Sequence, residues 1–385
     1  MHFNFGNFNW PIWDTNSTNF IKAFLLSNDS WSRGRIIEKF EKSFANYCNC
    51  KYCLLVNSGT SALKLALMAS GVGPGDEVIL PGLTWPSTAI AVMECGAKAV
   101  IVDIEISTFG ISPEAVRKNI TRNTKAVIAV HLYCSTANLT KLKEIAIKNK
   151  LLLIEDACQA IGGLWNNKQL GTIGDVGAFS FQEKKPLTCG EGGCIVTNNE
   201  SIFKQAFALR DHGNLPNNSK LKRCGSNYRI ASVNAAILMV QLEKLNTIIN
   251  LEDKNGSFLA KEINKIPNLI VLKRRNDLTI QNFYSFCFRL LTNELKNKKN
   301  EIIKDLTSTL GIKFSSSYPP LNDKDFFDPF LEYRYNGLFK FTDLKKCNQA
   351  FKESIRFPHQ FLLCSQEQIE NIALGMSEYF MKTLL

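Results

Sequence analysis

Short apolar runs alternate with helical stretches over residues 51–200, and this alternation limits the possible folds more than any other feature of the sequence. Continuous apolar strands separated by helices are typical of a mostly parallel sheet whose two faces are both covered. We therefore predict an α/β domain with its ligand site at the carboxyl ends of the strands. The predicted strands are KYCLLV (51–56), EVILP (77–81), AVIVDI (99–104), KAVIAV (125–130), LLLIEDA (151–157), GAFSF (177–181) and GGCIVT (192–197).

The pattern changes after about Ser232, where a long amphipathic helix is predicted over 232–266. Fewer and more scattered elements follow it, which indicates a second structural unit. We predict a large domain over 1–250 that includes an N-terminal segment, and a smaller α+β domain over 251–385. The smaller domain is expected to contain a strand at 283–291, a helix at 295–311, a loop at 315–330 and a last helix near 366–382.

Composition excludes several classes of protein. The 385 residues carry 46 basic and 35 acidic side chains, a net charge of +11, which permits anionic ligands without specifying them. No apolar run approaches the roughly 18 residues of a membrane-spanning helix, and the first residues lack the pattern of a secretory signal. The 12 cysteines are therefore interpreted as reduced thiols of a cytoplasmic protein. The basic runs at 272–275 and 295–304 lack the interleaved aromatics of a nucleic-acid-binding module.

The CNCKYC run, with Cys48, Cys50 and Cys53, could supply half of a metal site. A closed zinc site needs four ligands, usually in two pairs. The remaining cysteines are scattered and no pair of histidines lies nearby in the sequence. We therefore predict buried thiols and no metal.

Two strand ends carry residues suited to an anionic, aromatic ligand. In NSGTSAL (57–63), Gly59 and Thr60 would present free N–H groups at a helix N-terminus, which can bind a phosphate, although a plain capped helix has the same pattern. In IEDACQA (154–160), Asp156 would lie at the end of an apolar strand, where a buried carboxylate needs a cationic partner.

A third strand end leads into FQEKKPLTCGEGG, with Ser180 before two lysines, Lys184 and Lys185. A lysine held partly neutral can form a Schiff base, although a lone lysine in a loop is more often a surface charge. Taken together, these strand ends fit pyridoxal 5′-phosphate, which needs a phosphate cradle, a carboxylate against its ring nitrogen, a flat group over the ring and a lysine. Trp85 would be the flat group.

These motifs resemble the DegT/StrS group of sugar and cyclitol aminotransferases within the fold-type-I pyridoxal-phosphate superfamily. The resemblance covers nearly the whole chain, and it implies an aspartate-aminotransferase-like fold. The motifs that carry it are WSRG (31–34), FEKSFANY (40–47), NSGTSALKLAL (57–67), GVGPGDEVILPGLTWPSTA (71–89), VDI (102–104), TKAVIAVHLY (124–133), IEDACQA (154–160), FSFQEKKPLTCGEGG (179–193) and NYRIASVNAAI (227–237).

The resemblance also implies roles for single residues. The family's lysine lies five residues after the serine, which selects Lys185 over Lys184, and lysine in place of the histidine of dehydrating relatives implies transamination through pyridoxamine 5′-phosphate. Lys185 would be the general base and Asp156 would keep the ring nitrogen protonated. The implied cofactor contacts are Gly59, Thr60 and Ser180 for the phosphate, Trp85 for the ring face, Asp156 for the ring nitrogen, Gln159 near the phenolic oxygen, Lys185 for the Schiff base, and Asn227 for the phosphate of the other subunit of a homodimer with shared active sites.

Three departures from the family pattern concern the substrate. Gln182 replaces a frequent histidine and leans toward members that act on cyclitols in secondary metabolism, some with glutamine as the donor. Cys134 and Asn138 replace a glycine and an aspartate in a loop expected near the site. We expect a transaminase that moves an amino group from glutamate or glutamine to a ketone of a sugar, which could be nucleotide-linked, or of a cyclitol. The alternatives are an aminohydroxybenzoate synthase-like enzyme on another ring ketone and, least favoured, a regulator that binds the cofactor without catalysis.

Overall fold

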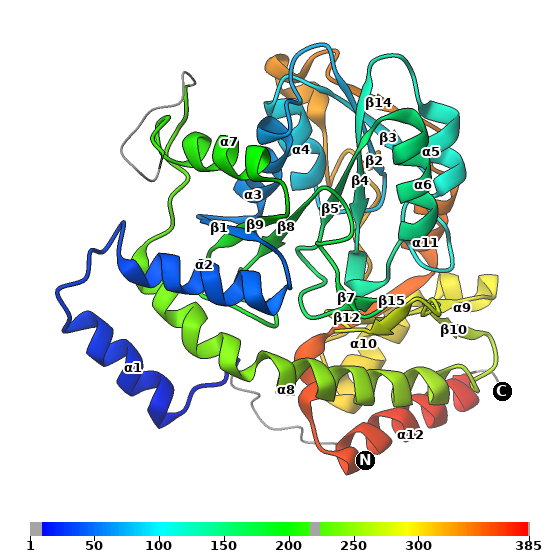
Figure 1. Cartoon of the computed structure of the whole chain (residues 1–385). Helices are drawn as coiled ribbons and strands as arrows, with labels where there is room; N and C mark the ends of the chain where they lie inside the picture. Colours follow the sequence, from blue (N-terminus) through cyan, green and yellow to red (C-terminus); the bar gives the residue numbers. More distant parts are fainter. Residues whose placement is uncertain (1–9, 216–223, 384–385) are drawn as a thin grey trace.

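The computed structural model describes residues 10–215 and 224–383, and its main element is an eight-stranded sheet (Figure 1). Within this described part, β9 pairs antiparallel with both of its neighbours and every other pairing is parallel. The sheet is therefore mostly parallel, as predicted. Across the sheet the strands are β1 (Tyr52–Val56), β9 (Gly193–Thr197), β8 (Val176–Ser180), β5 (Leu152–Asp156), β4 (Thr124–Val130), β2 (Glu77–Pro81), β3 (Lys98–Val102) and β14 (Phe339–Phe341).

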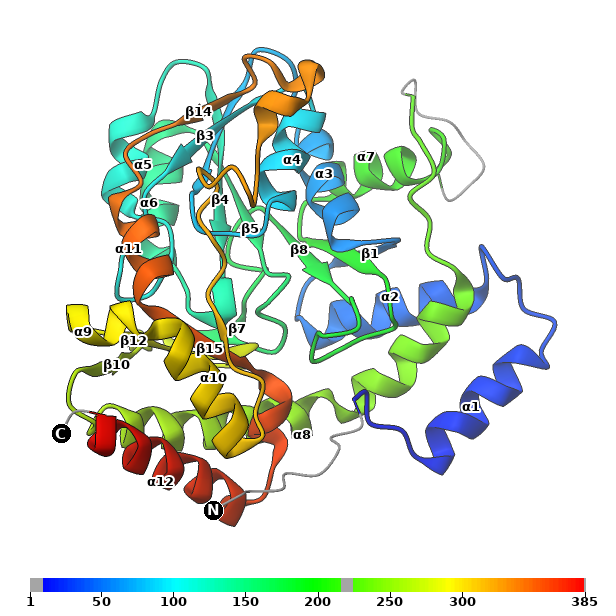
Figure 2. The ribbon, with the colours of Figure 1, turned by 180° about the vertical axis from the view of Figure 1, so that it is seen from behind.

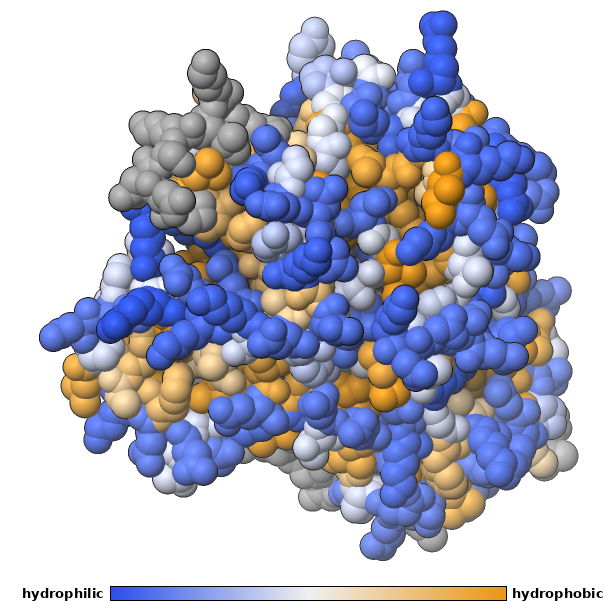
Figure 3. Space-filling model, in the orientation of Figure 1, coloured by the Kyte–Doolittle hydropathy of each residue, from blue (hydrophilic) through white to orange (hydrophobic). Residues whose placement is uncertain are grey.

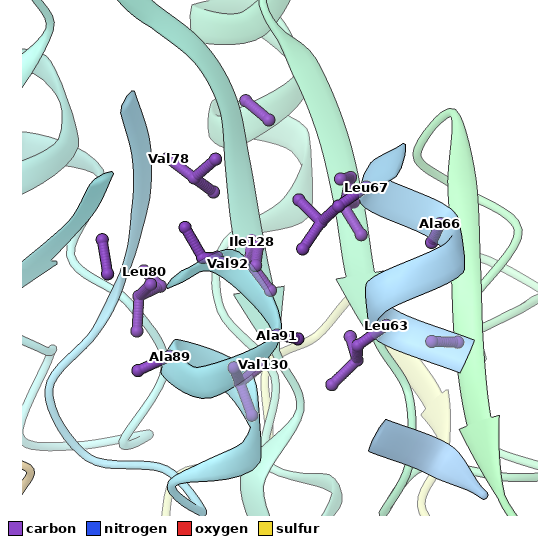
Figure 4. Close-up of a cluster of buried hydrophobic side chains, with 14 of the residues drawn as sticks. Leu63, Ala66, Leu67, Val78, Leu80, Ala89, Ala91, Val92, Ile128 and Val130 are labelled. Atoms are coloured by element: carbon purple, nitrogen blue, oxygen red, sulfur yellow. The ribbon is translucent and has the colours of Figure 1, made fainter. Parts of the chain in front are cut away.

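Helices cover both faces of this sheet because its strands are apolar on both sides. Successive side chains of a strand point to opposite faces, so Leu54 and Leu55 of β1 belong to two different apolar clusters. Figure 4 shows part of the first cluster, where α3 and α4 pack on β2 and β4. The first cluster is covered by α3 (Gly59–Ala69), α4 (Ser87–Glu94), α7 (Glu200–Arg210) and α11 (Lys345–Glu353), and the second by α2 (Arg35–Tyr47), α5 (Pro113–Asn119), α6 (Leu139–Asn149) and the first half of α8 (Ser232–Ile263).

A third apolar cluster lies around a smaller antiparallel sheet of order β10-β12-β15-β13. The second half of α8 packs there through Leu259 and Ile263, so one helix runs along both parts of the molecule (Figure 2). This region contains β10 (Leu269–Val271), β12 (Ser285–Leu290), β15 (Ser354–Pro358), β13 (Ser315–Ser316), α9 (Asn293–Asn297), α10 (Lys299–Leu310) and α12 (Gln366–Thr383).

The remaining elements are short, apart from the N-terminal helix. They are α1 (Thr15–Leu25), the small sheet of β11 (Leu278–Ile280), β6 (Leu164–Trp165) and β7 (Lys168–Gln169), and the 3-10 turns η1 (Leu132–Cys134), η2 (Pro329–Leu331), η3 (Tyr333–Tyr335) and η4 (His359–Leu363).

The structure differs from the sequence prediction in its second half. The helix expected over 295–311 is divided into α9 and α10 at Lys298, although Gly311 does end it with a φ of +66°. The loop expected over 315–330 contains β13. Strand β14 extends the large sheet at β3 from a position late in the chain, and α8 continues through residue 250, so the domain division there stays a prediction. The prediction that the first residues lack a secretory signal rests on residues 1–9, which lie outside the described residues.

The face drawn in Figure 3 is mostly polar, and one of the places where apolar atoms are exposed on it is where Figure 1 places α1. Phe20 and Leu25 of that helix are exposed, as are Trp13 and Trp31 beside it. Over the described residues, each helix is too short or too polar to span a bilayer.

Candidate active site

A cavity of about 760 Å³ opens at the carboxyl ends of the parallel strands. One wall is formed by residues at or just after the ends of β1, β2, β5 and β8. The facing wall is formed by residues of β12 and β15, the segments next to them and the loop around 313–318. Such a cavity is of the size that holds a small-molecule ligand. It contains seven of the eight residues that the sequence predicts for the site: Gly59, Thr60, Trp85, Asp156, Gln159, Ser180 and Lys185.

The predicted phosphate cradle forms where α3 begins. Ser58 caps the helix by accepting the Ser61 N–H at 3.1 Å, so Gly59 and Thr60 occupy the first turn, whose N–H groups have no partners within a helix. A Cβ placed on Gly59 would lie 2.7 Å from the Cβ of Ser180 and 3.1 Å from the Sγ of Cys158. This position therefore requires glycine, and it brings the helix N-terminus against the serine at the end of β8.

Asp156 is the last residue of β5 and is 6% exposed. The Thr88 hydroxyl donates to its Oδ2 at 2.9 Å and the Cys158 N–H donates to its Oδ1 at 3.3 Å. Thr88 is in turn 2.9 Å from the Thr84 hydroxyl. These contacts hold the carboxylate at the cavity edge in a fixed orientation, where it can pair with a cationic ligand atom.

The two adjacent lysines lie in different surroundings. Lys184 is exposed, whereas Lys185 is 8% exposed, with its Nζ 4.2 Å from the centroid of the Tyr284 ring. Burial lowers the pKa of Lys185, and the nearby Asp156 opposes that shift only in part. A lysine with a lowered pKa has the neutral amine that a nucleophile or general base needs.

Gln159 and Trp85 lie on either side of a group of aromatic rings. The Gln159 Oε1 accepts the Tyr133 N–H at 3.0 Å, and its amide nitrogen is 3.5 Å from the Tyr318 hydroxyl. Trp85 is 52% exposed and its ring lies 5.4 Å from that of Tyr318 and 5.7 Å from that of Phe326. A flat ligand could therefore stack against Trp85.

Asn227 is the predicted residue that the structure leaves outside this cavity. It is exposed, accepts the Arg229 N–H at 3.2 Å and pairs through its main chain with Asp211. Arg33 and Arg229 both form ion pairs with Asp211. Asn227 therefore lies next to a cluster of charged side chains outside the cavity.

Two substituted positions expected near the site do not line the cavity. Cys134 is buried, and a Cβ on Gly163 would lie 2.8 Å from its Sγ. The Asn138 side chain caps α6 by accepting the Lys141 N–H at 3.0 Å. Asparagine and aspartate are equally good at this capping role, so the Asn138 side chain has a structural role away from the cavity lining.

Sequence reasoning missed the facing wall, in which Arg356 is the main charged group. Its guanidinium carbon lies 5.1 Å from the Tyr318 ring and 5.4 Å from the Tyr133 ring, and one of its nitrogens donates to Ser285 at 3.2 Å. Among the described residues, its buried Nε has no hydrogen-bond partner. The only signal in the sequence is an arginine between two apolar residues, Ile355 and Phe357.

Over residues 10–215 and 224–383, no three histidine, cysteine or acidic side chains are grouped as a metal site. Cys48 and Cys53 are buried, and burial raises the pKa of Cys50 to about 12. The CNCKYC thiols are therefore protonated at neutral pH.

The residues of the cavity fit pyridoxal phosphate. The N-terminus of α3, with Gly59 in its first turn, can bind a phosphate. The Asp156 carboxylate can pair with a protonated ring nitrogen, and the buried Lys185 amine can react with an aldehyde carbon. These three features line one cavity, so a single ligand could contact all of them.

Comparison with known proteins identifies the family. The profile of the DegT/DnrJ/EryC1/StrS aminotransferase family matches residues 14–376. The chain is 35% identical to the GDP-perosamine synthase of Caulobacter vibrioides, over 81% of this chain and 84% of that one. It is 33% identical to the L-glutamine:2-deoxy-scyllo-inosose aminotransferase of Streptomyces kanamyceticus, over 85% and 81% of the two chains.

Solved structures agree with this assignment. A 3-amino-5-hydroxybenzoic acid synthase, 26% identical, superposes with a TM-score of 0.88 over 97% of this chain and 98% of its own. The DesV protein of S. venezuelae, crystallised with a ketimine intermediate, is 28% identical and superposes with a TM-score of 0.81 over 95% of this chain and 94% of its own. The chain has the fold-type-I architecture predicted from its sequence and belongs to the DegT/DnrJ/EryC1/StrS family, as an aminotransferase whose cofactor is pyridoxal phosphate.

Proposed function

We propose that this aminotransferase moves an amino group from glutamate or glutamine to a ketone on a sugar or cyclitol ring. The observation that carries the chemistry is the buried Lys185 amine in one cavity with the Asp156 carboxylate. The relatives support the substrate class, since they include a synthase of a GDP-linked amino sugar and glutamine-dependent aminotransferases of inososes. Amino sugar or aminocyclitol biosynthesis would be the pathway.

The predicted site residues at the ends of the parallel strands would then have the following roles. Pyridoxal phosphate, when bound, supplies a ring that withdraws electrons from the carbon bearing the amino group. Asp156 would hold the ring nitrogen in its charged form, and Lys185 would take the proton from that carbon as a base and later donate a proton at another atom as an acid. Gly59, Thr60 and Ser180 would hold the phosphate, Trp85 would cover the ring, and Gln159 would lie near the phenolic oxygen.

Arg356 gives the amino-acid donor a binding group. A carboxylate of glutamate or glutamine can accept two parallel hydrogen bonds from a guanidinium. Arg356 lines the cavity, its guanidinium contacts Ser285 and two tyrosine rings, and its buried Nε has no hydrogen-bond partner among the described residues. The two tyrosine rings beside it would exclude water from that contact and strengthen it.

A homodimer with shared active sites would give Asn227 its role. The residue is exposed and lies outside its own cavity, and apolar side chains are exposed on and around α1. We propose that Asn227 donates a hydrogen bond to the cofactor phosphate in the other subunit. A mixture of inactive Lys185→Ala and inactive Asn227→Asp subunits should regain activity, because one site of the mixed dimer carries both defects and the other carries neither. If each site belongs to one chain, the mixture stays as inactive as its parents.

One experiment tests the function directly. The purified protein is converted to the pyridoxamine phosphate form with glutamate or glutamine, and keto sugars, inososes and non-sugar ring ketones are then offered while the cofactor spectrum is followed. Return of the pyridoxal phosphate spectrum with a keto sugar or inosose supports the proposal. The second candidate, reaction with another ring ketone, is favoured by the similarity to the 3-amino-5-hydroxybenzoic acid synthase, and reaction with those ketones alone would replace the proposal.

A further inference from the structure

A buried carboxylate and imidazole that the proposed chemistry does not use lie directly behind the lysine loop. Glu252 of α8 and His359 of η4 are both 0% exposed, and the Glu252 Oε1 is 2.6 Å from the His359 Nδ1. The other ring nitrogen, Nε2, is 3.1 Å from the main-chain carbonyl oxygen of Lys184. Three distant parts of the sequence therefore form one line of polar contacts that ends next to Lys185.

The chemistry of these atoms fixes where the protons are. A carbonyl oxygen can only accept a hydrogen bond, so the His359 Nε2 carries a hydrogen and donates it to Lys184. One further proton is then shared between Nδ1 and the Glu252 carboxyl group. Burial raises the pKa of Glu252 to about 7, so this carboxyl group retains a proton more readily than an exposed glutamate. The pair therefore favours the one ring tautomer that can hold the lysine loop.

The carbonyl that accepts this hydrogen bond belongs to the same peptide unit as the Lys185 N–H. That N–H donates to the Gln182 carbonyl oxygen at 2.9 Å, while the Lys184 N–H donates to the Gln182 side chain at 2.9 Å. The peptide before Lys185 is therefore held at both ends, by Gln182 on one side and His359 on the other. Rotation of this peptide would change the direction in which the Lys185 side chain leaves the main chain.

His359 also contacts the ring that supports the Lys185 amine. Its ring stacks on Tyr284 at a centroid distance of 6.2 Å, and the Lys185 Nζ lies 4.2 Å from the centroid of Tyr284. On its other side, Trp10 meets His359 edge-on at 4.8 Å and donates to the Glu183 carbonyl at 2.9 Å. One imidazole thus touches both the peptide and the aromatic surface that place the amine.

We propose that Glu252 and His359 are positioning residues that fix the 184–185 peptide and the Tyr284 ring, and thereby the direction of the Lys185 amine. This inference rests on the proposed role of Lys185 as the reacting lysine. No sequence pattern indicated a role for His359 or Glu252.

The alternative is that the pair only joins α8 to η4. A neighbouring contact provides the matched control, since the Asn255 amide of α8 donates to the carbonyls of Leu362 and Cys364 at 2.8 and 3.0 Å. It joins the same helix to the same segment but does not reach the lysine loop. An Asn255→Leu variant should therefore lose stability without moving Lys185.

The first measurement uses the cofactor-free protein and does not depend on activity. The pKa of Lys185 is obtained from the pH dependence of its acylation, followed by mass spectrometry of the Lys185 peptide. In His359→Leu and Glu252→Leu the amine should gain access to water, so its lowered pKa should rise toward the ordinary value. In Glu252→Gln it should stay as in the unmodified protein, because the amide can still donate to Nδ1 and keep the ring tautomer.

The second measurement uses the cofactor-loaded enzyme. In His359→Leu, kcat should fall at least tenfold, toward the roughly hundredfold loss that a 1 Å misplacement of a reacting group costs, while KM changes less than kcat. The conservative variant Glu252→Gln should keep kcat close to that of the unmodified enzyme. If His359→Leu does not fold, His359→Gln, which keeps a donor for Lys184 but not the pairing with Glu252, should give a smaller loss of the same kind.

Two results would overturn the inference. One is a folded His359 variant in which both the pKa of Lys185 and kcat are unchanged. The other is an Asn255→Leu variant that shifts both as far as His359→Leu does, which would make the pair a purely structural contact. Failure of the proposed function is distinguishable, because borohydride would then not attach the cofactor to Lys185 in the unmodified protein.

Discussion

The two walls of the cavity differ in how their residues reach it. The strand-end wall (Gly59, Thr60, Asp156, Ser180 and Lys185) comes from segments next to the carboxyl ends of parallel strands. The facing wall comes from antiparallel strands and loops, with the residues Tyr284, Lys313, Tyr318 and Arg356. Most of the first wall comes from motifs that lie more than a hundred residues earlier in the chain. In the proposed function, the first wall would hold the cofactor and Arg356 of the second wall would bind the carboxylate of the amino-acid donor.

The largest expected effect separates the two adjacent lysines of the strand-end wall. Replacing Lys185 with alanine should lower the rate of transamination by several orders of magnitude, because the residue that binds the cofactor and moves the proton is lost. Replacing the exposed Lys184 with alanine should leave most of the activity. Turnover is measured with a saturating donor and ketone, and borohydride reduction should attach the cofactor to Lys185. Attachment to Lys184 alone would contradict the assignment.

The next effect concerns Asp156. Its replacement with alanine leaves a buried ring nitrogen without its charged partner, and breaking such a pair costs about 3–5 kcal/mol. We expect kcat to fall by roughly two to four orders of magnitude. Thr88→Val removes one hydrogen bond to this carboxylate and should cost only about 1 kcal/mol. Near-normal turnover in Asp156→Ala would mean that another group supports the ring.

The comparison also explains how much of the fold could be predicted. The sequence predicted the strands of the large sheet between β1 and β9. These strands are buried on both faces, and such burial requires a continuous apolar run that is visible in the sequence. Strand β14 was missed, since its three residues FKF carry little signal and it joins the sheet only through tertiary packing against β3. The break between α9 and α10 was missed because the basic stretch 295–304 reads as continuous helix.

The site divides in the same way. Gly59 and Asp156 were predictable because a strand end determines their place whatever the rest of the chain does. Arg356 and His359 were not, because a lone arginine or histidine shows no periodicity and its neighbours depend on how β15 and η4 pack against the large sheet. The resemblance to a family supplied Asn227, which no pattern within one subunit could indicate.

A smaller effect tests the facing wall through Arg356. Arg356→Met removes a charged donor from the proposed carboxylate site, and a hydrogen bond to a charged group contributes about 1.5–3 kcal/mol. KM for the amino-acid donor should rise by roughly ten- to a hundredfold, with little change in KM for the ketone. The matched control is Lys313→Met, which changes an exposed cation on the same wall. An equal rise in both KM values would show that Arg356 does not select the donor.

The smallest effect concerns the free energy of unfolding. Burying the reactive Lys185 amine in the strand-end wall should lower it. Lys185→Met in the cofactor-free protein replaces a buried amine with an apolar side chain and should raise the free energy of unfolding at pH 7 by about 1 kcal/mol or more. Because the folded protein has a lowered pKa at Lys185, it binds fewer protons than the unfolded chain between that pKa and 10.5. The stability of the unmodified protein should therefore rise with pH in that window, and the advantage of Lys185→Met should shrink. Thermal unfolding at pH 7 and above pH 9 measures this, with Lys184→Met as the exposed control. A lower Tm for Lys185→Met at pH 7 would mean that the amine has stabilising contacts that outweigh its burial.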